Sequence, residues 1–293
     1  REGRQFDPVI AHHIPLQFGR GHSDFSSGDE PAVKIGLIGN GTIARVVTTH
    51  CEGSDGRIEI VGAVVLSEDG PSVGCHPTFK TLDPVLAMGP ELILECAAQQ
   101  AVFDYGTQIL KAGVDLMVIS VGALADAGLR ANLEQEARAQ NTKVIIPAGA
   151  LAGLDAITAA KTDGLERVLL RTRKPPNSWA GAPGVEGVDL DGITEPTTIF
   201  SGSAGAAARA FPKNANVAAA VALAGIGVDE TQVELIADPG VTRNIHHIEA
   251  EGAFGRLEID VQAEPSPNNP KTSHLAALSI VRQLDKLTEP IQI

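Results

Sequence analysis

Aromatic side chains are scarce in this chain. Trp, Tyr and Phe together make up 3% of the 293 residues, with one Trp and one Tyr. The hydrophobic fraction is nevertheless 43%, an ordinary value for a folded globular protein. We therefore expect hydrophobic cores built from Ala, Val, Ile and Leu, and the length allows two domains with separate cores.

Positive charge, long apolar runs and cysteine are also in short supply. The 23 Lys and Arg stand against 36 Asp and Glu, and the resulting net charge of -13 disfavours a nucleic-acid backbone as a partner. We expect no membrane span, because no apolar run reaches the roughly 18 residues that a span needs. The three cysteines, Cys51, Cys75 and Cys96, are odd in number and lack metal-ligand spacing. This pattern favours reduced thiols in a cytoplasmic protein, with no metal site.

Residues 1–30 differ from the rest of the chain. They have no sustained apolar period, and they lack the continuous apolar core of a signal peptide. Three histidines, His12, His13 and His22, stand there among Gly, Ser and Asp. We interpret this segment as a leader or tag-like tail and look for the fold after it.

A glycine-rich turn follows the first strand pattern. Val33–Ile38 is a short apolar run typical of a buried parallel strand, and Gly39-Asn-Gly-Thr-Ile-Ala44 continues it with the spacing G-x-G-x-x-A. In a dinucleotide-binding turn the first glycine permits the turn, the second lets a pyrophosphate approach, and the small third residue lets the helix pack on the strand. The anion binds free N–H groups at the helix N-terminus. An ordinary glycine turn is the alternative, and the predicted cofactor contacts are Gly39, Gly41, Thr42, Ile43 and Ala44.

Strand and helix patterns alternate through the first half of the chain. Strands are predicted at 57–66, 91–98, 115–122 and 143–147, and helices at 81–88, 101–111 and 129–140. This alternation predicts an α/β fold with a Rossmann-type doubly wound parallel sheet and a cofactor at the carboxyl ends of its strands. The small-residue turn that ends the segment 91–98 adds Ala97 to the predicted cofactor contacts.

The end of the predicted strand 57–66 bears on the choice of cofactor. NAD-preferring sites usually place an Asp or Glu there to bind the ribose. Here Leu66 and Ser67 occupy that point, and Glu68 and Asp69 come slightly later. The choice between NAD and NADP stays open, with NAD favoured by the local negative charge.

The pattern changes after residue 153. Helices are predicted at 154–162, 204–211, 215–223 and 273–287, and strands at 168–173, 231–237, 245–250 and 255–263. We expect a second α+β domain with a mixed or antiparallel sheet, because the last of these strands alternates as a half-covered strand does. The predicted divisions are a dinucleotide-binding domain at 31–152, a substrate and dimerisation domain at 153–268, and a C-terminal helix at 269–293 that returns to the first domain.

Polar residues of the second half are the candidates for chemistry. His246 and His247 are adjacent, so on a strand their side chains face opposite sides. Histidine is a common acid or base beside a nicotinamide, and the polar segment Arg243-Asn-Ile-His246 favours His246 over a purely structural role. Asn216 is a candidate for binding the nicotinamide amide and Lys213 for a substrate carboxylate, whereas a helix cap by Asn214 is the simpler interpretation of that segment.

One further segment has two interpretations. The backbone of the turn at residues 148–153, which includes Ala150, could line the nicotinamide ribose. Alternatively, this turn is a simple hinge between the two predicted domains.

Six segments in this order resemble bacterial-type L-aspartate dehydrogenases: Gly39-Asn-Gly-Thr-Ile-Ala44, Ser120-Val-Gly-Ala-Leu-Ala-Asp126, Gly149-Ala-Leu-Ala-Gly-Leu-Asp155, Phe211-Pro-Lys-Asn-Ala-Asn-Val217, Asn244-Ile-His246 and Asn269-Pro-Lys-Thr-Ser273. The resemblance implies oxidative deamination of L-aspartate with NAD or NADP, giving iminosuccinate and then oxaloacetate and ammonia. The iminosuccinate can also feed NAD biosynthesis. The resemblance further implies cofactor contacts from Ala150 and Asn216, and His246 as the active-site residue. It also implies a mixed sheet in the second domain and a homodimer.

The chemistry of aspartate adds its own requirements. Its two carboxylates need cationic or amide donors, for which the candidates are Lys213, Arg243, Asn244, Lys271 and Arg173. A histidine with a pKa near 7 would activate the water that attacks the imine.

Two alternatives remain. A dihydrodipicolinate reductase-like oxidoreductase also has a His-His pair, but there a Lys and a Pro-Ser-Gly-Thr run follow, whereas Ile-Glu-Ala-Glu-Gly follows here. A non-catalytic NAD(P)-binding sensor is the other.

Overall fold

The computed structural model describes residues 31–65, 74–266 and 269–292, without the side chains of residues 213 and 269–272. The predictions for the segment 1–30 and for the ribose position at residues 66–69 lie outside this described part. Residues Ala32–Ile293 form one compact unit.

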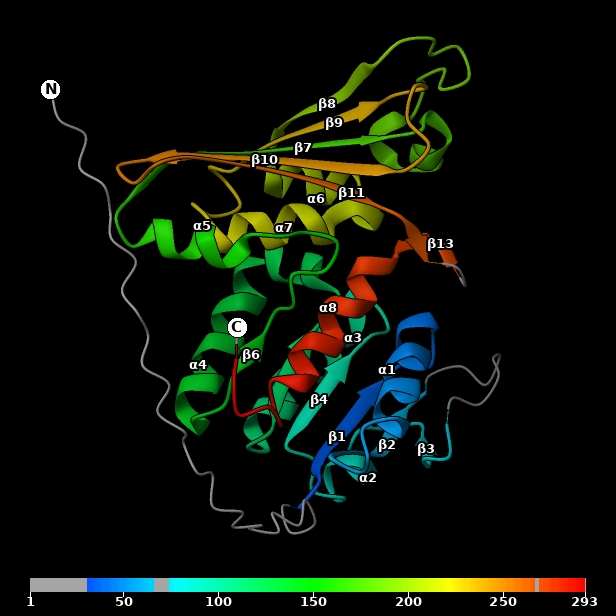
Figure 1. Cartoon of the computed structure of the whole chain (residues 1–293), viewed down its shortest axis with the longest axis vertical. Helices are drawn as coiled ribbons and strands as arrows, with labels where there is room; N and C mark the ends of the chain where they lie inside the picture. The colour runs from blue at the N-terminus through cyan, green and yellow to red at the C-terminus, as the bar shows by residue number, and fades with distance from the viewer. Residues whose placement is uncertain (1–30, 66–73, 267–268, 293) are drawn as a thin grey trace, which may run out of the picture. The chain divides into compact units, whose positions relative to one another are not determined.

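Six parallel strands make the first sheet, in the order β3-β2-β1-β4-β5-β6 (Figure 1). Their bounds are β1 Val33–Ile38, β2 Ile58–Val64, β3 Thr78–Phe79, β4 Leu92–Glu95, β5 Asp115–Val118 and β6 Val144–Ile145. The order runs outward from β1 in one direction and from β4 in the other, which makes the gap between these strands a topological switch point. The predicted doubly wound parallel sheet is confirmed.

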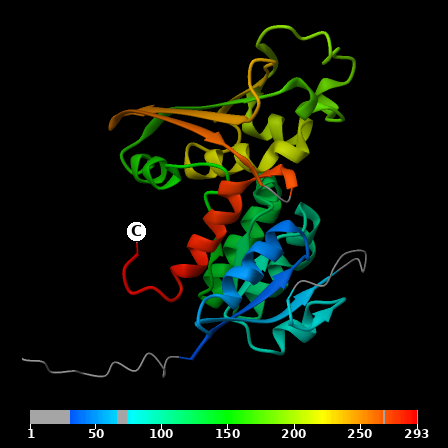
Figure 2. The same cartoon turned by 45° about the vertical axis from the view of Figure 1, so that its right-hand side comes forward.

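Helices cover both faces of this sheet. They are α1 Thr42–Glu52, α2 Asp83–Leu86, α3 Gln99–Lys111, α4 Ala127–Gln140 and the C-terminal α8 His274–Asp285. On one face, Leu37 of β1 packs in a cluster with Ala44 of α1 and Leu284 of α8. Figure 2 shows α8 running beside α1, an arrangement that the contacts between these two helices support. No described helix has the length and apolar character that a bilayer crossing requires.

Five strands make the second sheet, in the order β11-β10-β7-β9-β8. Their bounds are β7 Leu165–Lys174, β8 Thr197–Ser203, β9 Gln232–Ala237, β10 Asn244–Gly252 and β11 Gly255–Ala263. Only β7 and β9 run parallel to each other among these pairs, so the sheet is mixed, as one of the two predicted forms required. The hairpin of β12 Pro265–Ser266 and β13 Asn269–Ser273 leads from this sheet into α8.

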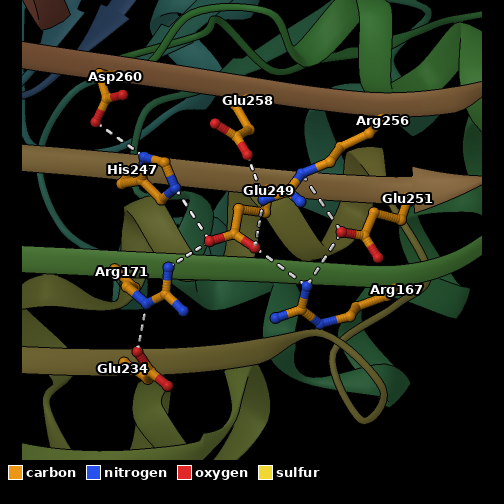
Figure 3. Close-up of polar contacts among 9 residues, drawn as sticks. All are labelled: Arg167, Arg171, Glu234, His247, Glu249, Glu251, Arg256, Glu258 and Asp260. Carbon is orange, nitrogen blue, oxygen red and sulfur yellow. Dashed lines mark hydrogen bonds and ion pairs between the residues drawn. The ribbon is translucent and has the colours of Figure 1, made fainter.

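The two faces of the second sheet differ in character. Helices α5 Leu154–Lys161, α6 Ala204–Ala210 and α7 Ala215–Ala224 lie against one face (Figure 1). The other face carries a network of charged side chains from four strands (Figure 3): Arg167, Arg171, Glu234, His247, Glu249, Glu251, Arg256, Glu258 and Asp260. Because side chains alternate along a strand, intervening residues such as Leu170, Ile248 and Ala250 point to the other face, where they are buried.

Glu249 stands at the centre of this network. Its side chain is 8% exposed and accepts hydrogen bonds from Arg171, from Arg167 at 3.1 Å and from His247 at 3.2 Å. Burial alone would raise the pKa of this carboxyl, but the three donors outweigh it and lower the pKa to about 2. The outer face of β7, β10 and β11 is therefore held by an ionised carboxylate at any pH near neutrality.

Candidate active site

The glycine corner lies at the carboxyl end of β1. Gly39 has a φ of +109°, and a Cβ at this position would lie 3.0 Å from the carbonyl oxygen of Cys96 and 3.1 Å from the Cα of Ala97. Both the dihedral angle and the close approach require glycine. At Gly41, by contrast, a Cβ would meet nothing within 4 Å. The backbone at the start of α1 is therefore open, and this open corner fits the pyrophosphate of a dinucleotide.

Ala44 explains the third position of the motif. It is fully buried and packs in the cluster that contains Ile35 and Leu37 of β1. A small side chain at this point brings α1 close to the strand.

Glu95, the last residue of β4, holds the neighbouring loops in place. Its fully buried carboxylate accepts hydrogen bonds from the backbone of Ala97 at 2.8 Å, from that of Ile119 at 3.2 Å, and from both the backbone and the hydroxyl of Ser120 at 2.9 Å. Burial raises the pKa of this carboxyl, and the hydrogen bonds oppose that shift. One side chain thus ties the end of β4 to the end of β5 beside the switch point.

A cavity of about 280 Å³ brings the first sheet's loops together with the second sheet. From the first half it is lined by Ile43, Ile119, Val121, Pro147, Ala148, Gly149, Ala150 and Leu151, and from the second half by Lys174, Asn214, Asn216, Val217, Ala220, Asn244 and His246. Ser273, Ala276 and Ile280 close it from the C-terminal segment. Five predicted site residues therefore meet here: Ile43, Ala150, Asn216, Asn244 and His246.

Two larger hollows lie elsewhere, of about 560 and 660 Å³. Neither is lined by a residue of the glycine corner or by His246. The cavity of about 280 Å³ is the better candidate for the active site. Its walls combine loops at the carboxyl ends of the parallel strands, where a cofactor binds, with titratable side chains from the second sheet.

His246 faces this cavity from β10. It pairs with Thr172 of β7, whose hydroxyl lies 3.0 Å from the imidazole Nδ1. The side chain is only 2% exposed, and burial, together with the charge of Lys174, lowers its pKa to about 3. The imidazole is thus neutral at pH 7. This low pKa differs from the pKa near 7 that was expected from the sequence for its role. His247 points the other way and lies 2.9 Å from Asp260, which confirms the prediction that the two histidines face opposite sides.

Asn216 links the two halves of the chain. Its side-chain oxygen accepts a hydrogen bond of 2.9 Å from the backbone N–H of Gly122. A Cβ at Gly122 would lie 2.4 Å from the Gln99 amide nitrogen and 2.8 Å from the Cβ of Ala215. Only glycine fits at position 122. Because the hydrogen bond uses the side-chain oxygen of Asn216, the amide NH₂ can donate to another group.

Asn214 does not act as a helix cap. It occupies the position before α7, yet its side chain caps none of the described N–H groups there. Instead the side-chain oxygen accepts a hydrogen bond from the Lys174 ammonium. The simpler interpretation of this segment is therefore wrong for the side chain of Asn214.

The turn that contains Ala150 is fixed by the C-terminal helix. Gly149 has a φ of +64°, and its N–H donates a hydrogen bond of 2.9 Å to the hydroxyl of Ser279 on α8. Residues 147–151 line the cavity. The ribose-lining interpretation of this turn stays a prediction.

Not every predicted substrate-binding cation lines the cavity. Arg243 pairs with Glu264 at 2.5 Å, and Arg173 donates to Asp238 at 2.9 Å. The side chains of Lys213 and Lys271 lie outside the described part. Lys174 does line the cavity, although the sequence prediction did not include it.

A signal for Lys174 was available in the sequence. The predicted strand 168–173 ends one residue before it. Because side chains alternate along a strand, Lys174 shares the inner face with Leu170 and Thr172, and all three line the same small hollow.

Comparisons with known proteins show the family of the chain. The family model described as "Aspartate dehydrogenase, C-terminal" matches residues 155–287, and "Homoserine dehydrogenase, NAD binding domain" matches residues 35–147. The L-aspartate dehydrogenase of Methanosarcina acetivorans is 42% identical over 269 residues, which cover 89% of this chain and 99% of that protein. The L-aspartate dehydrogenase of Cupriavidus necator is 46% identical over 272 residues, covering 88% and 99%.

A solved structure shows the same arrangement. The crystal structure of aspartate dehydrogenase from Thermotoga maritima superposes with a TM-score of 0.69 and 28% sequence identity, covering 89% of this chain and 99% of that chain. The sequence and structural matches extend over both sheets. The chain therefore belongs to the L-aspartate dehydrogenase family.

Proposed function

We propose that this chain catalyses the NAD(P)-dependent oxidative deamination of L-aspartate to iminosuccinate, which water converts to oxaloacetate and ammonia, and the reverse amination. The observation that carries the proposal is the single cavity that joins Ile43 at the glycine corner, Ala150 in the turn after β6, and His246 on the second sheet. Its charged and amide side chains suit a small dicarboxylic substrate. Membership of the L-aspartate dehydrogenase family supplies the substrate.

The cofactor contacts follow from the corner and the cavity. When bound, NAD(P) supplies the nicotinamide that accepts a hydride. Gly39, Gly41, Thr42, Ile43 and Ala44 would hold its pyrophosphate, and Ala97 lies against Gly39 at the end of the next strand. Ala150 and Asn216 would hold the nicotinamide end.

His246 is the proposed catalytic residue. A neutral imidazole with a buried partner at Nδ1 has Nε2 as its second site for a proton. Burial and the charge of Lys174 keep the pKa low, and a substrate with two carboxylates brings the negative charge that raises the pKa again. We infer that His246 takes a proton from the water that attacks the imine, once the substrate occupies the cavity.

The proposal includes a cytoplasmic homodimer. Cys51, Cys75 and Cys96 are free thiols, and Cys75 is exposed, which supports a reducing compartment. The dimer is inferred from the family resemblance, and sedimentation velocity on the purified chain tests it directly.

A spectrophotometric screen tests the activity. L-aspartate, D-aspartate, glutamate and homoserine are each incubated with NAD and with NADP, and absorbance at 340 nm is followed. We expect an increase with L-aspartate, and the ratio of the two rates gives the cofactor preference. Tight NAD(H) binding with no aspartate-dependent increase would show a sensor instead of an enzyme.

A further inference from the structure

Lys174 is held in an unusual setting at the end of β7. Its ammonium donates a hydrogen bond to Asn214 and lies 5.1 Å from the centroid of the Trp179 ring. Trp179 is itself buried and packs edge-on against Phe211, with the ring centroids 5.8 Å apart. The ammonium is thus fixed in place by an amide oxygen and an aromatic face, neither of which neutralises its charge.

The neighbouring cations on the same strand form ion pairs. Arg173 binds Asp238, and Arg171 binds both Glu234 and Glu249. Among the described side chains, no carboxylate lies within ion-pair distance of Lys174. Burying a charge without a counter-ion costs stability, and burial lowers the pKa of this lysine to about 8. A negatively charged ligand in the cavity would offset this cost by pairing with Lys174.

The cavity itself offers the place for that ligand. Of the described side chains that line it, Lys174 is the one that carries a charge at neutral pH, because His246 is held neutral. Lys174 and His246 also line the smaller hollow that adjoins the cavity. Lys174 therefore lines the cavity from the second sheet, at the end of β7.

The geometry points to Lys174 as the residue that binds the side-chain carboxylate of the substrate, and so selects a dicarboxylic 2-amino acid. This inference rests on the proposed function. Hydride transfer requires the substrate Cα to face the nicotinamide at the first-sheet end of the cavity. The α-carboxylate and the amine are attached to Cα, whereas the side-chain carboxylate extends one carbon farther, toward the Lys174 that the second sheet contributes.

Lys174→Met tests this with two readouts. The first is kcat/KM for L-aspartate, which we expect to fall by roughly 10²-fold, because a buried charged hydrogen bond is lost. The second is binding to the complex with NADH, followed by fluorescence, of succinate and of butyrate. Succinate is aspartate without the amine, and butyrate replaces one of its carboxylates with a methyl group. We expect the variant to lose the preference for succinate, with the affinity for NADH unchanged.

Two further variants complete the design. Lys161→Met removes an exposed lysine at the end of α5 and so makes the same change of charge outside the cavity; it should behave as the wild type. Lys174→Gln retains a donor for Asn214 and should show the same losses, which keeps the test available if the Met variant does not fold.

The outcomes separate the two proposals. A wild-type chain that does not oxidise L-aspartate overturns the proposed function, whereas the succinate measurement can still be made. An active wild type with an equally active Lys174→Met overturns the role of Lys174. Equal losses of succinate and butyrate affinity overturn the assignment to the side-chain carboxylate.

Discussion

The imidazole of His246 and the ammonium of Lys174 line one cavity from neighbouring strands, and the charge of Lys174 adds to burial in lowering the pKa of the imidazole to about 3. Two basic groups that share a buried space disfavour each other's protonation. A substrate with two negative charges reverses this relationship, because it favours the protonated form of both groups. The site is thereby matched to a dicarboxylate before any contact with the cofactor is considered.

His246→Ala should reduce turnover of L-aspartate by roughly 10²–10⁴-fold, the usual contribution of a general acid or base. The affinity for NADH should stay the same, because His246 lies on the second sheet and not at the glycine corner. Steady-state kinetics and fluorescence titration measure the two quantities. His247→Ala is the matched control, since that side chain points to the outer face. Near-wild-type turnover of His246→Ala would remove this residue from the mechanism.

Alanine substitutions of the two motif glycines should have different effects on stability and on cofactor affinity. Gly39→Ala forces a side chain into a left-handed conformation against Cys96, so both the melting temperature and the affinity for the cofactor should fall. Gly41 has a φ of -75° and open space around its missing Cβ. Gly41→Ala should therefore keep its melting temperature but bind NAD(H) more weakly, because the methyl group occupies space needed by the pyrophosphate. Equal decreases in the melting temperature of the two variants would contradict this account.

Glu95→Gln should weaken the cofactor site through its supporting loops. The amide NH₂ would face backbone N–H groups of Ala97 or Ser120 that now donate to a carboxylate, and a buried donor left without an acceptor costs about 1–3 kcal/mol. We expect that loss in chemical denaturation, together with a raised Kd for NADH. Stability equal to the wild type would show that water or another group replaces the acceptor.

Much of the fold could be predicted from local patterns. The strand Val33–Ile38 and the helix that follows its glycines were found because apolar runs and small residues carry a clear period there. Strand β8, at Thr197–Ser203, was not predicted, because its side chains are mostly half-buried or exposed and its sequence has no apolar alternation. Its place at the sheet edge comes from pairing with β9, a contact that no local pattern encodes.

The site was predicted only in part, for a related reason. His246 and Asn216 stand in recognisable polar segments, whereas Lys174 follows a strand and stands beside two prolines. Strand alternation places Lys174 on the opposite face from Arg171 and Arg173, but it does not show that this face lines a cavity. The difference arises in three dimensions, where the two arginines meet carboxylates and the lysine meets a cavity. The roles of all these residues stay predictions until the variants are measured.

Glu249→Gln should destabilise the chain in a pH-dependent way. Since the carboxyl pKa falls to about 2 on folding, its contribution is fully present above its ordinary value of about 4.5 and is lost as the pH falls from there toward 2. We expect a loss on the order of 1–3 kcal/mol at pH 7, shrinking through that window in urea denaturation. Glu258→Gln, whose side chain is half exposed beside Arg256, is the control with a smaller effect. A loss that does not change between pH 7 and 2 would exclude this ionisation as its cause.

Lys174→Met should make the chain more stable, although it makes the enzyme worse. Burial lowers the pKa of Lys174 to about 8 from an ordinary value of 10.5, so the folded state binds fewer protons than the unfolded state between these values and wild-type stability rises with pH across that window. Below pH 8 both states are protonated and the full cost of burying the charge remains. The variant lacks that cost, and its advantage, on the order of 1–3 kcal/mol at pH 7, should disappear as the pH approaches 10.5. Unfolding in urea at pH 7, 8, 9 and 10 measures it, and a variant less stable than the wild type at pH 7 would mean that the lysine supports the fold.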